Sequence, residues 1–214
     1  MSIVTQQTEA WAGKFGQEYT DRNAITPDGM ELLYSNNYGI TRTEMNLEFI
    51  GDLERSIRIC EVGSNIGNQL INLQKLGFKS LYGIEIQEYA VELSKSRTKN
   101  INIIQGTAFD IPYKDGFFDL VFTSGFLIHI APSDLESALN EIYRCTSKYI
   151  WGFEYFAEKY TGIEYRGNDH LLWKADFAQI YLHAFDNLRL VKESRFRYLN
   201  SENVDSMFLL VKTD

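Results

Sequence analysis

The chain has 214 residues, is 44% hydrophobic and contains only 3 prolines, a composition typical of one globular α/β domain with a well-filled core. Its 29 acidic and 21 basic residues give a net charge of −8, which argues against a general grip on the phosphate backbone of a nucleic acid. We find no secretory signal pattern and no apolar run long enough to span a bilayer, so we expect a cytoplasmic protein without nucleic-acid or membrane partners.

The two cysteines, Cys60 and Cys145, lie in apolar segments and lack the spacing of a zinc site. We expect both to be reduced core residues, and we predict no bound metal. The sequence does not indicate an oligomeric state.

Aromatic residues recur at every fourth position near the N-terminus. Trp11, Phe15 and Tyr19 have this spacing, which places them on one face of a helix. We expect this face either to pack the helix on the domain or to close over a ligand.

A glycine-rich loop follows the first predicted strand, which covers residues 57–61. The strand ends in Glu61, and the loop carries Gly63 and Gly67 four positions apart. The first glycine permits a tight turn against a ligand, and the second permits close packing of the next helix on the sheet. Asn65 lies between them and is one of the few residue types other than glycine that tolerate a left-handed conformation.

Strands and helices alternate regularly from residue 56 to residue 154. The predicted strands cover residues 57–61, 80–85, 101–105, 120–123, 149–154, 188–191 extending to 198, and 207–211. The predicted helices cover residues 66–76, 87–97, 135–143 and 176–185, and a capping box at 133–136 begins the third of these. Helical crossovers imply a parallel, doubly wound sheet.

The last two predicted strands are joined by the short polar turn 200–203. No crossover helix fits in this turn, so the two strands must pair antiparallel. The sequence therefore predicts an α/β fold with a doubly wound, Rossmann-like, seven-stranded, mostly parallel sheet and a C-terminal antiparallel hairpin. We divide this single domain into an N-terminal helical cap (1–50), a core (51–154), an insertion (155–187) and the terminal hairpin (188–214).

Glu85 ends the second predicted strand, 24 positions beyond Glu61. Ligands of doubly wound sheets bind at the carboxyl ends of the strands, where the Glu85 carboxylate could accept both ribose hydroxyls of a nucleoside. The alternative is a solvated loop acid. Glu61 could likewise orient the glycine loop or contact a ligand amino group.

The order acid-x-Gly-x-x-x-Gly at Glu61–Gly67, with the acid at a strand end, resembles motif I of the class I S-adenosylmethionine-dependent methyltransferases. It is less similar to the nicotinamide fingerprint, which has three glycines in the order G-x-G-x-x-G. Residues 106–112 resemble the family's Gly-Asp-Ala-x-x-x-Pro segment, but Thr107 replaces the acid that binds adenine there, which leaves adenine to backbone groups or to Asp110. Residues 118–125 resemble motif IV, which implies that Ser124 and Gly125 lie beside the methionine end of the cofactor.

The resemblance implies S-adenosylmethionine as the cofactor. Tyr19 and Arg22 on the N-terminal helix could meet its methionine carboxylate, since the planar fork of an arginine can bind both carboxylate oxygens. The predicted cofactor-binding residues are Tyr19, Arg22, Glu61, Gly63, Asn65, Gly67, Glu85, Ile86, Thr107, Ala108, Ser124 and Gly125.

Segments along nearly the whole chain resemble a narrower group, the methylases associated with pseudaminic acid biosynthesis. These segments are 11–23, 63–67, 127–130, 154–155, 165–167 and 176–178. The family takes its name from nonulosonic-acid pathways, and the name does not specify the methyl acceptor.

Methyl transfer to a hydroxyl or a protonated amine needs a dry pocket and a group that takes the proton. His129 follows motif IV and is our candidate base, with a packed or helix-capping histidine as the alternative. Glu154 ends the fifth strand and is the second catalytic candidate. The long connection that follows mixes aromatic and charged residues, as would suit a polar acceptor with a carboxylate or phosphate, although a purely structural loop is also possible. The predicted acceptor-binding residues are Tyr155, Tyr165, Arg166, His170, Trp173 and Lys174.

The sequence thus predicts a methyltransferase that acts on oxygen or nitrogen of a small polar acceptor, such as a sugar or sugar-nucleotide derivative. Two alternatives are a nicotinamide-dependent oxidoreductase on a similar sheet and a non-catalytic, cofactor-binding regulatory module. The absent central glycine and the terminal hairpin argue against the oxidoreductase. The crowded polar residues around the fifth strand argue against the regulatory module.

Overall fold

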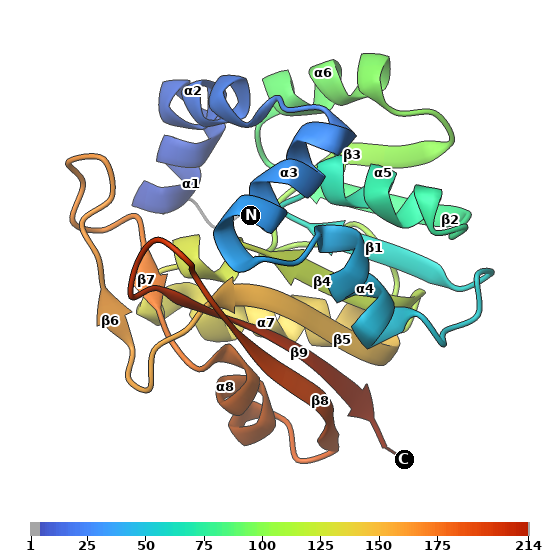
Figure 1. The fold of residues 1–214 in the computed structure, drawn as a ribbon. Coiled ribbons are helices and arrows are strands. Elements are labelled where there is room, and N and C mark those ends of the chain that lie inside the picture. Colours follow the sequence, from blue (N-terminus) through green and yellow to red (C-terminus); the bar gives the residue numbers. More distant parts are fainter. Residues whose placement is uncertain (1–4, 214) are drawn as a thin grey trace.

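The computed structural model describes residues 5–213. Seven strands form one sheet in the order β3-β2-β1-β4-β5-β9-β8 (Figure 1). The strands are β1 (Arg58–Val62), β2 (Ser80–Glu85), β3 (Ile101–Gln105), β4 (Phe118–Ser124), β5 (Thr146–Tyr155), β8 (Leu188–Arg197) and β9 (Val204–Lys212). The predicted fold class is confirmed, and each predicted strand is present: β2 and β3 have the predicted bounds, and the ends of the others are shifted by a few residues.

The first five strands pair in parallel, and β9 pairs antiparallel with both β5 and β8. The strand order reverses between β1 and β4, which makes the carboxyl ends of these two strands the expected ligand position of a doubly wound sheet. Because β9 runs antiparallel to β5, the first residues of β9 lie at this same edge. Asp205 pairs there with Tyr155, the last residue of β5.

Helices cover both faces of the sheet (Figure 1). On one face, α4 (Arg42–Ile50), α5 (Asn68–Lys75) and α6 (Glu88–Arg97) contribute apolar side chains to one buried cluster. On the other, α7 (Pro132–Cys145) and α8 (Phe177–Ala184) contribute to a second cluster. Neighbouring residues of β9 alternate between the two, since Met207 belongs to the first and Phe208 to the second. Cys60 and Cys145 are both buried free thiols, as expected.

The N-terminal aromatic segment is not one continuous helix. It forms α1 (Gln6–Ala12) and α2 (Lys14–Asn23), and the extended backbone of Gly13 separates them. The aromatic contacts survive the break because Trp11 at the end of α1 packs edge-on against Phe15 and Tyr19 of α2. A third helix, α3 (Pro27–Tyr38), follows.

The predicted capping box at 133–136 is wrong. Helix α7 begins at Pro132, before the predicted N-cap residue Ser133. Its actual N-cap residue, Ala131, has no side chain that can accept a hydrogen bond. Proline suits the first helical position because its missing N–H has no partner there. A short 3-10 turn, η1 (Leu127–His129), precedes α7, and the insertion contains a two-stranded ribbon of β6 (Thr161–Gly162) and β7 (Trp173–Lys174). In the part of the chain that the structure describes, no helix is long and apolar enough to cross a membrane.

Candidate active site

One cavity of about 380 Å³ lies at the carboxyl edge of the sheet and has an enclosing wall from the N-terminal helices. The strand ends of β1, β2, β4 and β5 form its floor, and α1, α2 and α3 contribute the remaining wall. The volume falls in the range of small-molecule sites. The position is the one expected for a ligand of a doubly wound sheet.

The glycine loop has the backbone conformation that its sequence predicts. Gly63 and Gly67 have φ angles of 75° and 82°, and Asn65 has a φ of 45°. A Cβ at Gly63 would lie 2.2 Å from a ring atom of Phe126, and one at Gly67 would lie 2.7 Å from Ile103 of β3. Both positions therefore exclude any side chain, the first because the next loop is close and the second because α5 begins close to the sheet.

Glu85 holds the glycine loop and the next turn together through both of its carboxylate oxygens. One oxygen accepts a hydrogen bond from the backbone N–H of Asn65 (2.7 Å), and the other accepts one from that of Gln87 (2.8 Å). Burial raises the pKa of this carboxyl, and the two backbone N–H groups act in the opposite direction. Each carboxylate oxygen can accept a second hydrogen bond, so the predicted contact with a ribose diol is compatible with this geometry.

Glu61 lines the cavity, and one of its carboxylate oxygens is buried without a hydrogen-bond partner. Burial raises the pKa of Glu61, while the positive charge of Arg42 acts to lower it. Arg42, a residue that the sequence analysis missed, is fully buried and donates to the hydroxyls of Tyr34 (2.9 Å) and Ser124 (3.2 Å). An unsatisfied buried acceptor facing a cavity is suited to a ligand ammonium group.

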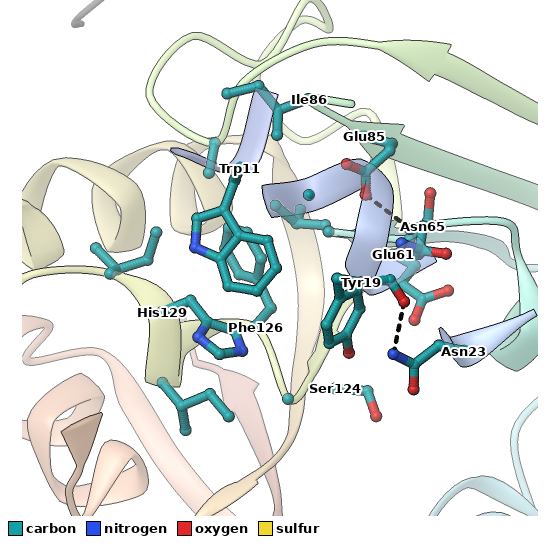
Figure 2. A pocket seen from close by; sticks show the side chains of 18 of the residues that line it. Trp11, Tyr19, Asn23, Glu61, Asn65, Glu85, Ile86, Ser124, Phe126 and His129 are labelled. Carbon is teal, nitrogen blue, oxygen red and sulfur yellow. Dashed lines mark hydrogen bonds between the residues drawn. The ribbon is translucent and has the colours of Figure 1, made fainter. Parts of the chain in front are cut away.

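The helices α1 and α2 are attached to the two predicted cofactor loops by side-chain hydrogen bonds. The side-chain amide of Gln87 donates to the carbonyls of Trp11, Ala12 and Gly13, at 3.2, 2.9 and 2.7 Å. Asn65 donates to the hydroxyl of Thr20 on α2 (2.9 Å). Figure 2 shows the rings of Trp11 and Tyr19 inside the cavity, between His129 on one side and Glu61 on the other.

Most predicted cofactor residues line this cavity, and two do not. Those that line it are Tyr19, Glu61, Gly63, Asn65, Glu85, Ile86, Thr107, Ala108, Ser124 and Gly125. Gly67 lies behind the loop at the start of α5. Arg22 is exposed and outside the cavity wall, so the geometry does not support its predicted contact with a carboxylate. Asp110, the alternative for adenine, is likewise exposed, which leaves the backbone of residues 106–108.

His129 is buried in the cavity wall against the indole of Trp11, with 4.3 Å between ring centroids. Its Nδ1 lies 2.7 Å from the carbonyl oxygen of Leu171. Because a carbonyl only accepts, Nδ1 carries the proton and Nε2 has the free lone pair. Burial lowers the pKa of His129 to about 4, although its bond to Leu171 acts to raise it. The ring is therefore neutral at pH 7, and its Nε2 can accept a proton or a hydrogen bond.

Glu154 lies beneath the loop that carries His129 and is not part of the cavity wall. Its two carboxylate oxygens accept from the backbone N–H groups of Phe126 (3.2 Å) and Ile128 (3.5 Å). Burial raises the pKa of Glu154 to about 7, against these hydrogen bonds. The carboxylate of Glu154 holds the loop and is not in the cavity wall, so this geometry does not support a catalytic role, which stays a prediction.

The predicted acceptor residues divide into two groups. Tyr155 and Tyr165 line the cavity. Arg166 and His170 are exposed on the insertion, and Trp173 and Lys174 belong to β7 outside the cavity wall. None of these four residues lines the cavity, and their contact with an acceptor stays a prediction. Arg166 and Lys174 each pack on an aromatic ring that lines it, those of Tyr165 and Tyr155 respectively.

The sequence analysis predicted Tyr155 but missed the other residues that complete the wall beyond β5. The wall there consists of Tyr34, Tyr38, Phe153, Tyr155, Tyr198 and Asp205. Two signals were available: Tyr34 and Tyr38 are four positions apart on α3, and Asp205 is an acid at the start of an otherwise apolar strand. Their convergence depends on the antiparallel register of β9, which no local pattern specifies.

Comparison with protein families gives a match over residues 60–149 to the family described as "Methyltransferase domain". The matched segment runs from β1 to β5. It therefore contains the glycine loop, Glu85, the segment at residues 106–108 and the loop that carries His129.

Solved structures with this fold include several methyltransferases. The 1,6-didemethyltoxoflavin-N1-methyltransferase of Burkholderia thailandensis, solved with 1,6-didemethyltoxoflavin and S-adenosylhomocysteine, has a TM-score of 0.69 at 12% identity, covering 100% of this chain and 94% of that one. The magnesium protoporphyrin IX methyltransferase of Synechocystis PCC 6803, solved with S-adenosylmethionine, has a TM-score of 0.66 at 11% identity, covering 100% of both chains. A methyltransferase of Methanosarcina mazei has a TM-score of 0.61 at 13% identity, covering 76% and 95%. At these identities the likeness shows the fold.

Proposed function

We propose that this chain, which is a class I S-adenosylmethionine-dependent methyltransferase, transfers a methyl group to an oxygen or nitrogen atom of a small polar acceptor. Its cofactor is S-adenosylmethionine, which supplies an electrophilic methyl group when bound. The match of residues 60–149 to a methyltransferase domain favours this function over a nicotinamide oxidoreductase and over a non-catalytic regulatory module. The acceptor class and the roles of single residues are the proposed part.

The residues of the cavity fit the proposed cofactor positions. Glu85 retains lone pairs for a ribose diol, and the unpartnered oxygen of Glu61 suits the methionine ammonium group. Ser124 ends β4 and Gly125 follows it at the switch point, beside the glycine loop, where we place the methionine end. The break at Gly13 and the side chain of Gln87 keep Trp11 and Tyr19 over this position.

The observation that carries the proposal is the continuity of the cavity. Its wall runs from the nucleoside side at Glu85, past the glycine loop and β4, to the tyrosines beyond β5. The part of the cavity beyond β4 is not lined by the proposed cofactor-binding residues, so it is available to the acceptor. It is lined by aromatic rings with hydroxyl groups and lies beside the neutral imidazole of His129. This combination suits a small polar molecule, and we propose that His129 Nε2 accepts the proton that the acceptor loses.

We propose a sugar or sugar-nucleotide derivative as the acceptor, in line with the resemblance to methylases associated with nonulosonic-acid pathways. Aromatic rings and polar side chains together suit a sugar ring, which has apolar faces and hydroxyl edges. Arg166 and Lys174 lie outside the cavity but pack on aromatic residues of its wall. In this proposal they hold an anionic part of the acceptor at the rim of the cavity.

The division of the domain into cap, core, insertion and hairpin stays a prediction.

The experiment is transfer of a labelled methyl group from S-adenosylmethionine to a panel of neutral sugars, amino sugars and nucleotide sugars. Labelled product is expected with members of the panel, and mass spectrometry of the product then distinguishes O-methylation from N-methylation. The matched comparison is His129→Ala, which should transfer far less label while still binding S-adenosylhomocysteine. Label that appears only on protein or nucleic acid, or equal transfer by both proteins, would contradict the proposal.

A further inference from the structure

Asp205 is a buried acid in the cavity wall with no role in the proposed cofactor site. It is 1% exposed and is the second residue of β9, where it pairs with Tyr155 of β5 and Phe196 of β8. Both register partners and the residues on either side of Asp205 belong to regular strands. Its position is therefore fixed by the backbone of the sheet and does not depend on a flexible loop.

The carboxylate of Asp205 is only half satisfied within the protein. Its Oδ2 accepts hydrogen bonds from the hydroxyls of Tyr38 (2.5 Å) and Tyr198 (3.3 Å). Its Oδ1 is buried and has no hydrogen-bond partner among the described residues. A buried oxygen without a donor is costly, and native proteins rarely retain one unless a ligand or a water satisfies it. The two tyrosines orient the carboxylate and leave Oδ1 for another molecule.

Aromatic rings surround the acid on the cavity side. The ring of Tyr38 packs on those of Tyr34, Phe153 and Tyr198, with centroids 5.5, 6.0 and 4.7 Å away. All of these residues line the cavity together with Asp205. Such rings can stack on the face of a sugar or surround a cationic group, while the carboxylate accepts a hydrogen bond from its edge.

The charges of the cavity wall favour the same type of ligand. The described residues that line it include four acids, Glu61, Glu85, Asp134 and Asp205, but no lysine or arginine. Arg42 lies behind the wall, and Arg166 and Lys174 lie outside it. The positive charges of Lys174 and Arg42 act on Asp205 from outside and behind the wall, but neither residue lines the cavity. A phosphate or carboxylate buried beside Asp205 would therefore face a like charge with no lysine or arginine in the wall to pair with it, which is unfavourable. A neutral or cationic group faces no such penalty.

The sheet separates Asp205 from the proposed position of the cofactor by a distance that accommodates a sugar ring. Ser124, at the proposed methionine end, is the last residue of β4, and Asp205 lies two strands further along, on β9. Neighbouring strands are about 4.8 Å apart, so the two positions are separated by about 10 Å. One sugar-sized ring fits between a methyl donor near β4 and a carboxylate on β9.

From this geometry we infer that Asp205, oriented by Tyr38 and Tyr198, is the acceptor-recognition group of the enzyme, and that its Oδ1 accepts a hydrogen bond from a hydroxyl or amino group of a neutral or cationic acceptor ring. The inference rests on the proposed function and restricts the acceptor to molecules whose reacting ring is neutral or cationic. Any anionic part of the acceptor must lie at the rim, away from the reacting ring.

The test measures binding of three matched pyranoses, namely methyl glucoside, glucosamine and glucuronic acid, to protein saturated with S-adenosylhomocysteine. Saturation-transfer NMR reports each affinity. Methyl glucoside and glucosamine should both bind more tightly than glucuronic acid, and the stronger of the two identifies a hydroxyl or an amine as the preferred donor. In Asp205→Asn, binding of the preferred sugar should weaken by about tenfold or more, with the affinity for S-adenosylhomocysteine unchanged. Asp186→Asn, which removes the same charge from an exposed position, should behave like the wild type.

The inference is overturned if glucuronic acid binds most tightly, if Asp205→Asn keeps the wild-type affinities, or if none of the three sugars binds. In each case intact binding of S-adenosylhomocysteine shows that the methyltransferase assignment stands while the acceptor site is wrong. If Asp205→Asn fails to fold, Tyr198→Phe replaces it, because this change removes one donor to Oδ2 and keeps the ring. Its predicted result is weaker binding of the preferred sugar with unchanged affinity for S-adenosylhomocysteine, and wild-type affinity for all three sugars would overturn the inference.

Discussion

Glu85 shows at the scale of one residue how a side chain can serve the fold and a ligand together. Its two oxygens already hold the backbone of Asn65 and Gln87, so removal of the side chain would disturb both loops. Glu85→Gln is therefore a sharper change than Glu85→Ala, since the amide oxygen can still accept one of these bonds.

We expect Glu85→Gln to weaken the binding of S-adenosylhomocysteine by about 1.5–3 kcal/mol, the size of a hydrogen bond to a charged group. Isothermal calorimetry measures this loss. Glu88→Gln, three residues away and exposed at the start of α6, is the matched control and should bind as the wild type does. Unchanged affinity in Glu85→Gln would mean that Glu85 only braces the loops.

The expected role of His129 as a base predicts a distinctive pH dependence. Burial lowers its pKa to about 4, so Nε2 keeps its lone pair throughout the range from pH 5 to 8. Turnover at saturating acceptor should therefore not fall around pH 6.5, where an unperturbed histidine would become protonated. A fall in turnover centred near pH 6.5 that is present in the wild type and absent in His129→Ala would contradict the lowered pKa of His129.

His129→Ala itself should lower turnover by about 10²–10⁴-fold, the usual contribution of a general base. Affinity for S-adenosylhomocysteine should not change. Single-turnover kinetics with labelled cofactor measure the first quantity, and calorimetry measures the second. Loss of cofactor binding would instead indicate that His129 packs the wall, as its contact with Trp11 also allows.

Asp205 should destabilise the free protein at neutral pH. Burial raises its pKa from 3.8 to about 6, so the carboxyl group ionises at a lower pH in the unfolded state than in the folded state. This group therefore stabilises the fold fully below about pH 4, and that contribution is lost as the pH rises through about 6. Urea unfolding should show Asp205→Asn to be more stable than the wild type by about 1–3 kcal/mol at pH 8, with the difference shrinking toward pH 4. A variant that is less stable at pH 8 would assign Asp205 a structural role.

At the scale of elements, the hydrogen bonds between the end of α1 and the turn after β2 all come from one side chain. The side-chain amide of Gln87 alone donates to three carbonyls at the end of α1. The carbonyls of Trp11 and Ala12 belong to the last turn of α1, where carbonyls lack intrahelical partners, whereas that of Gly13 also accepts from the backbone N–H of Gln17 in α2. The helix therefore depends on a residue two positions beyond Glu85.

We expect Gln87→Ala to increase cleavage near Gly13 in limited proteolysis and to weaken binding of S-adenosylhomocysteine. Gln74→Ala is the matched control, since Gln74 also donates its side-chain amide to a backbone carbonyl, that of Lys99, on an exposed surface. The proteolysis rate of this control at Gly13 should equal that of the wild type. Equal rates in all three proteins would mean that α1 is held by packing alone.

Local patterns predicted the elements that depend on local physics. The strands β1 to β5 and the left-handed conformation at Asn65 follow from hydrophobic runs and from glycine spacing. The break at Gly13 did not follow, because helical spacing continues across it. Arg166 and Lys174 were placed in the site on chain position alone, and neither residue lines the cavity. Asp205 needed the register between β5 and β9, a long-range property of the sheet.

At the scale of the whole molecule, the sheet sets the order of the site. The nucleoside side lies at β2, the glycine loop and β4 follow, and the tyrosines with Asp205 lie at β5 and β9. Donor and acceptor thus occupy neighbouring strand ends of one rigid sheet. The N-terminal helices close the remaining side (Figure 1).

The most direct test of this account is thermal unfolding with S-adenosylhomocysteine or NADH. A ligand of the folded state at a hundred times its dissociation constant adds about 2.7 kcal/mol of stability, and for a chain of this size each kcal/mol raises Tm by about 2–4 °C. We predict a rise of this order with S-adenosylhomocysteine, a smaller rise in Glu85→Gln at the same concentration, and none with NADH. A rise with NADH and none with S-adenosylhomocysteine would contradict the account.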